Sequence, residues 1–142
     1  MAQGTTNFPT SLDTARENPS NMDSSEAAIL AMQAKMGVIQ LAAADGAISL
    51  AAGECVITKS ASAAALTLAA PTTAMNGQRL VIVSTTAQAH VVTATNLIDD
   101  GVTGGAKDTA TFGAFAGASI ELMAYGGKWL VLNKNVVTVA GS

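Results

Sequence analysis

The sequence predicts a mainly β protein, whose compact antiparallel β-sandwich or jelly-roll-like domain follows an extended N-terminal arm and one short α-helix. From about residue 38 the chain consists of short alternating runs separated by turn signals such as Asn76-Gly77. Hydrophobic residues make up 49% of the chain and charged residues 12%, which is too apolar for a disordered protein. A length of 142 residues fits one domain plus an appendage. We therefore divide the chain into 1–22, 23–37 and 38–142.

Residues 1–22 are expected to form an extended arm. Pro9 and Pro19 each disfavour helix at the preceding residue, and polar side chains fill many of the other positions. The sizeable apolar side chains are too few for a core: Phe8, Leu12 and Met22. Such an arm needs a surface to lie on, either its own domain or a partner.

Residues 23–37 carry the one clear helical pattern. Asp23 can cap the N-terminus with Glu26 three residues on, and Gly37 occupies the position of a C-terminal cap. The sizeable apolar positions fall on one stripe: Ile29, Met32 and Met36. A helix of about 13 residues is marginal alone in water, so this stripe either packs on the β domain or pairs with the helix of another copy.

The segment 38–142 is expected to be an antiparallel sandwich or small barrel, because its strand-like runs recur with turn signals between them. The predicted strands are 47–51, 54–58, 64–69, 78–84, 90–95, 109–112, 118–125, 128–133 and 135–139. Gly126-Gly127 between two apolar runs predicts a hairpin. Residues 99–108 are expected to form an exposed loop.

The residue types that carry chemistry give no catalytic constellation, and the chain is expected not to be an enzyme and to need no metal or cofactor. His90, the single histidine, has no neighbouring nucleophile motif and is interpreted as structural or surface-exposed. Cys55 lies within a predicted strand and is interpreted as a small buried hydrophobe. Asp99, Asp100 and Asp108 lack the spacing of a calcium loop.

Tyr125 and Trp129 flank the predicted hairpin turn. As large side chains in a chain with only 4% aromatic residues, they are expected in the core or in a contact between subunits. The alternative is an exposed aromatic platform that binds sugars.

Charge and hydropathy exclude several classes of partner and location. A net charge of −3 without a basic stripe argues against nucleic acid. No apolar run reaches about 18 residues, so no membrane-spanning helix is expected. The N-terminus lacks a basic start and an apolar core, which predicts no secretory signal. A lone cysteine fits folding in a reducing cytoplasm.

Two stretches resemble virion proteins of tailed bacteriophages. TNFPTSLDT at 6–14 followed by AAILAMQAKMGV at 27–38 is similar to an arm and short helix that attach such proteins to the particle. The later β pattern, including GQRLVIVS at 77–84 and KWLVLN at 128–133, resembles the β domains of phage head fibres and capsid decoration (cement) proteins. The segment ARENPSNMDSSE departs from the usual arm.

The resemblance implies a structural protein on the outer surface of the phage head, made in the cytoplasm of the host bacterium. Its partner would be the major capsid protein, whose subunits it would bridge to stabilise the shell. Phe8, Pro9 and Leu12 would anchor the arm. The protein would be a homo-oligomer, with a trimer favoured over a dimer. The alternative function is a short head-fibre or tail-associated module that binds host glycans through Tyr125, Trp129 and residues 99–108.

Overall fold

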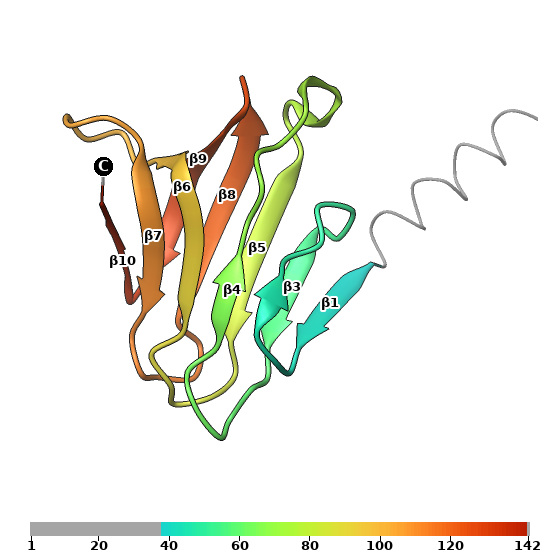
Figure 1. Cartoon of the computed structure of the whole chain (residues 1–142), viewed down its shortest axis with the longest axis vertical. Helices are drawn as coiled ribbons and strands as arrows, with labels where there is room; N and C mark the ends of the chain where they lie inside the picture. Colours follow the sequence, from blue (N-terminus) through green and yellow to red (C-terminus); the bar gives the residue numbers. More distant parts are fainter. Residues whose placement is uncertain (1–37, 142) are drawn as a thin grey trace, which may run out of the picture. The chain divides into compact units, whose positions relative to one another are not determined.

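Ten short strands make up most of the computed structural model, which describes residues 38–141 (Figure 1). The strands and one short 3-10 helix are β1 (Ile39–Ala42), β2 (Gly46–Ala47), β3 (Glu54–Ile57), β4 (Ala65–Thr67), η2 (Thr73–Met75), β5 (Arg79–Ser84), β6 (Val91–Asp99), β7 (Lys107–Phe112), β8 (Ser119–Tyr125), β9 (Lys128–Asn135) and β10 (Val137–Ala140). The mainly β character predicted from the sequence is confirmed for this part of the chain.

The first six strands alternate between two sides of the molecule. β1, β3 and β5 pair in parallel on one side, and β2, β4 and β6 pair in parallel on the other. From β1 to β6, each strand therefore lies on the side opposite to the strand before it. β8 then pairs antiparallel with β5, and β7 pairs antiparallel with both β6 and β10.

β9 joins the two sides into one nearly closed, barrel-like sheet of order β1-β3-β5-β8-β9-β6-β4-β2. It lies antiparallel to β8 and pairs in parallel with β6 at Ile98 and Asp99. The sheet stays open between its two end strands, β1 and β2. The side chain of Gln40 bridges this opening, since its Nε2 donates to the carbonyl oxygen of Ala47 at 3.0 Å and its Oε1 accepts from the Ser49 N–H at 2.8 Å.

The expected antiparallel arrangement is wrong for five of the nine strand pairings, which are parallel. From β1 to β6, successive strands cross to the opposite side of the barrel instead of returning as hairpins. Alternation in the sequence reports which side chains face inward but not which strand lies alongside. The finer sandwich or jelly-roll arrangement stays a prediction.

Individual strands follow the predicted positions closely, with two exceptions. β1 lies where the sequence predicted no strand, and the predicted strand 47–51 forms β2 only at its first residue. The Gly126-Gly127 hairpin is confirmed, because Tyr125 pairs with Lys128 across the turn. The expected exposed loop is shorter than 99–108, since β6 ends at Asp99 and β7 begins at Lys107.

The core fills the inside of the barrel with small and branched side chains. Cys55, Ile57, Ile82 and Ile98 are fully buried. Phe112 and Trp129 are the two largest fully buried side chains in the described part of the chain. This composition is consistent with the low aromatic content of the chain, which is 4%.

The expected arm and helix lie outside residues 38–141. The proposed arm anchors and the apolar helix stripe therefore stay predictions: Phe8, Pro9, Leu12, Ile29, Met32 and Met36.

Candidate functional site

His90 is a structural residue held inside the barrel. It is fully buried, and its Nδ1 accepts a hydrogen bond from the Ala64 N–H at 2.9 Å. The proton of the neutral ring is therefore on Nε2, which lies 2.8 Å from the hydroxyl oxygen of Thr86. That hydroxyl donates in turn to the carbonyl oxygen of Lys59 at 2.9 Å. The ring thus ties the start of β6 to the segment between β3 and β4.

The surroundings of His90 favour its neutral form. Burial of the ring, followed by the positive charge of Lys59, lowers the pKa of His90 below its usual value. Lys59 itself forms an ion pair with Asp45 at 2.7 Å, and this contact, followed by a hydrogen bond from the Ala65 N–H, lowers the pKa of Asp45. The neutral ring is hydrogen-bonded at both nitrogens inside the core. It connects neighbouring segments of the barrel and offers no exposed base.

Cys55 faces the core of β3 and is completely shielded from solvent. Burial raises the pKa of its thiol to about 11, so the nucleophilic thiolate is scarce at neutral pH. The interpretation of Cys55 as a small buried hydrophobe agrees with this placement.

The two aromatic residues beside the hairpin turn have opposite environments. Trp129 is buried, and its indole N–H donates to the carbonyl oxygen of Ala69 at 2.9 Å. Tyr125 is 60% exposed at the end of β8. The register explains the difference, since Trp129 pairs with the buried Ala124 whereas Tyr125 pairs with Lys128. Trp129 is a core residue and Tyr125 is not, so the pair does not form a shared aromatic platform.

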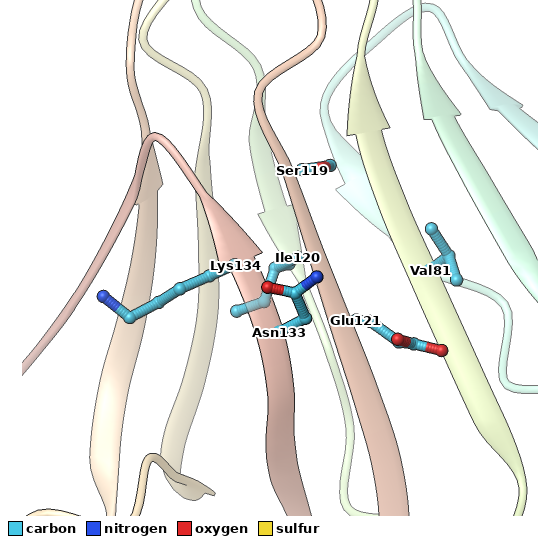
Figure 2. Close-up of a pocket in the computed structure, with 6 residues that line it drawn as sticks. All are labelled: Val81, Ser119, Ile120, Glu121, Asn133 and Lys134. Carbon is cyan, nitrogen blue, oxygen red and sulfur yellow. The ribbon is translucent and has the colours of Figure 1, made fainter.

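A shallow hollow of about 250 Å³ lies on the outside of β5, β8 and β9 (Figure 2). Its lining residues are Val81, Ser119, Ile120, Glu121, Asn133 and Lys134. Glu121 forms an ion pair with Arg79 at 3.2 Å, and Lys134 extends away from Glu121 in Figure 2. The hollow thus combines one carboxylate and one ammonium group with the Ser119 hydroxyl and the Asn133 amide.

Irregular pairing between β8 and β9 contributes to this hollow. Glu121 pairs with Asn133 and Leu122 pairs with Val131, so Leu132 is an extra residue in β9. The bulge leaves the Leu132 side chain 42% exposed.

Exposed apolar side chains gather on the outer surface of β1 and its neighbours. We define the apolar outer face by its five members, which the strand register places on one side of the sheet: Ile39, Leu41, Val56, Val81 and Val83. Ile39 and Leu41 are 52% and 68% exposed, while the three valines of β3 and β5 are half-buried. Sequence analysis missed this face because β1 inverts the usual alternation, with Gln40 directed toward the interior and its apolar neighbours outward.

A second exposed apolar site lies at the turn before β8 and the junction of β9 with β10. Phe115 and Val136 are 65% and 53% exposed. Val136 has a φ of 55°, which is unfavourable for a β-branched residue, and its carbonyl oxygen accepts from the Gly113 N–H at 2.8 Å. A Cβ on Gly113 would lie 2.4 Å from Val136 Cγ1, so glycine is required at this contact.

The acidic residues of the 100–106 loop region serve the backbone. Asp99 Oδ1 accepts from the Gly101 N–H and Asp100 Oδ1 accepts from the Val102 N–H, each at 3.2 Å. Within residues 38–141 no group of three or more His, Cys, Asp or Glu side chains is arranged to hold a metal ion. The same part of the chain contains no helix long and apolar enough to cross a membrane.

No protein-family model matches the chain, and no curated protein sequence matches it significantly.

Proposed function

We propose that this chain is a non-enzymatic structural protein of a bacteriophage virion, a capsid decoration protein on the outer surface of the head. It bridges neighbouring subunits of the major capsid protein and so stabilises the shell. The support from the sequence is the arm pattern at 6–14 and the helical pattern at 27–38, which resemble attachment segments of such proteins.

The structural observation that carries the proposal is the apolar outer face. Leu41 and Ile39 are among the most exposed large apolar side chains in residues 38–141, and they belong to the first strand after the expected attachment segment. Contiguous exposed apolar surface of this kind marks a contact with another protein. β1, the strand that follows the expected arm and helix, is thus suited to a contact with another subunit in an assembled particle.

The side chains of the most reactive residue types support a structural role. His90 and Cys55 are buried in the core, the first with both ring nitrogens hydrogen-bonded and the second with a raised pKa. Their contribution is to packing and to the connection between strands. We also propose that the two sides of the barrel act as the layers of a sandwich-like knob.

The mechanism is mechanical, because each oligomer attaches to the shell through several weak contacts. Phe8, Pro9 and Leu12 insert as apolar anchors, while the β domain remains outside the shell. An oligomer presents several arms at once, and linked binding sites raise avidity by about 10²–10⁴-fold without new contacts.

Co-sedimentation with undecorated phage heads tests the proposal. The full chain is expected to pellet with the heads, and a Phe8→Ala/Leu12→Ala variant is expected to remain largely in the supernatant. A Thr5→Ala/Thr10→Ala variant is the matched control, because it changes the same arm without removing large apolar groups. Equal pelleting of all three chains would contradict the assignment of the arm.

A glycan array distinguishes the alternative function. With Trp129 in the core, that function would depend on Tyr125 and the 100–106 loop alone. Binding to a surface sugar that is lost in Tyr125→Ala, together with no binding to heads, would favour the glycan-binding module.

A further inference from the structure

We propose that the apolar outer face is the contact surface between copies of this chain. This inference rests on the homo-oligomer that forms part of the proposed function, and it identifies the surface that would build that oligomer. It commits to a second copy of the chain as the occupant of the face.

The face is continuous across three strands because their residues are in register. Leu41 pairs with Val56, and Val56 pairs with Val83, which gives one uninterrupted apolar row. The row beside it runs from Ile39 through Glu54 to Val81. Within each row all side chains emerge on the same side of the sheet, opposite to the buried Cys55 and Ile57.

β1 is a four-residue end strand whose edge is spanned by the Gln40 side chain, and it lacks the other features that commonly protect such an edge. Its sequence IQLA contains no charged residue and no proline, and its pairing with β3 has no bulge. Figure 1 shows β1 at the outside of the β1-β3-β5 side of the barrel. An uncharged edge that carries two exposed large side chains favours association with another protein surface.

The two charged groups on this side of the sheet are complementary to one another. Glu54 is exposed between Ile39 and Val81, and no cation in the described part of the chain lies within ion-pair distance of its carboxylate. Arg79, two residues before Val81 on the same strand, has a side chain that is 62% exposed despite its contact with Glu121. Two copies can therefore pair Glu54 of one with Arg79 of the other beside the apolar row, as protein interfaces commonly combine apolar and charged contacts.

Sedimentation velocity of the full chain between about 0.5 and 50 μM tests the inference. The unsubstituted chain is expected to associate, and Leu41→Lys is expected to raise the dissociation constant at least about 10-fold. Phe115→Lys is the matched control, since Phe115 is 65% and Leu41 68% exposed but Phe115 lies outside the face. It is expected to leave the constant unchanged within about 2-fold. The emission of the buried Trp129 reports whether each variant is folded, and Ile39→Lys replaces Leu41→Lys if the latter is not.

Two results would overturn the inference: a monomeric unsubstituted chain at 50 μM, or equal association of the Leu41→Lys and Phe115→Lys variants. Because the assay contains no phage heads, its outcome does not depend on binding to the capsid. Association through this face without binding to heads would reject the capsid assignment alone.

Discussion

Replacing His90 by leucine removes a hydrogen-bonded connection without emptying the space that the ring occupies. The Ala64 N–H loses its acceptor at Nδ1, and the Thr86 hydroxyl loses its contact with Nε2 while it keeps the Lys59 carbonyl. An unsatisfied buried N–H costs about 1–3 kcal/mol, and a lost neutral hydrogen bond costs about 1 kcal/mol. We expect the free energy of unfolding at pH 7.5 to fall by about 2–4 kcal/mol.

The pH dependence of stability separates this explanation from a general loss of packing. Because the folded state lowers the pKa of His90, protons bind more readily to the unfolded chain. The unsubstituted protein is therefore fully stabilised above the unfolded pKa of about 6.5 and loses stability as the pH falls below it. The slope from this one group reaches at most about 1.4 kcal/mol per pH unit, and it should be absent from His90→Leu.

Urea unfolding followed by Trp129 fluorescence at pH 7.5 and 5.0 measures both effects. For an m-value of about 1–2 kcal/mol/M, the expected loss at pH 7.5 lowers the midpoint by about 1–4 M. Thr67→Val, a change at an exposed position of β4, is the control and should shift the midpoint little. Equal stability of His90→Leu and the parent, or an equal loss of stability in both proteins between the two pH values, would contradict the role assigned to the His90 hydrogen bonds.

Three further changes have defined outcomes. Gly113→Ala should destabilise the domain by about 1–3 kcal/mol in urea unfolding because its Cβ meets Val136, and adding Val136→Gly should recover part of the loss; no recovery would contradict this contact. Cys55 should resist alkylation in the folded protein at pH 8 and react on unfolding, as followed by mass spectrometry, whereas rapid native labelling would contradict its burial. The stabilisation from Asp45, whose pKa is lowered by Lys59, should be present at neutral pH and lost as the pH falls through the lowered value; Asp45→Asn should show less acid sensitivity.

The positions of most strands could be predicted because alternation and turn residues are local signals. Gly126-Gly127 fixed both the hairpin and its register, which is why β8 and β9 lie where expected. β1 was missed because VIQLAAA continues an alanine-rich helical pattern and its four residues are too few to show a period. Parallel pairing was missed because the choice of neighbouring strand depends on contacts distant in sequence.

The environments of single residues could likewise be predicted where local signals determine them, but not where they depend on contacts distant in sequence. Cys55 could be placed in the core because its position in a strand determines the side on which it lies. The burial of Tyr125 and Trp129 depends on which residues they pair with across the turn. The His90 ring is hydrogen-bonded to the Ala64 N–H through Nδ1 and to the Thr86 hydroxyl through Nε2. Only the folded chain brings Ala64 to the ring, because the two residues are 26 positions apart in the sequence. The apolar outer face likewise requires the register of three strands.

We propose that this chain stabilises a phage head by bridging its subunits through the N-terminal arm. Thermal release of DNA from filled heads, followed with a DNA-binding dye, measures this stabilisation. Heads saturated with the full chain should release DNA at a higher temperature than undecorated heads, while heads mixed with the Phe8→Ala/Leu12→Ala variant should behave as undecorated ones. An unchanged release temperature with the bound full chain, or equal protection by the arm variant, would contradict the claim.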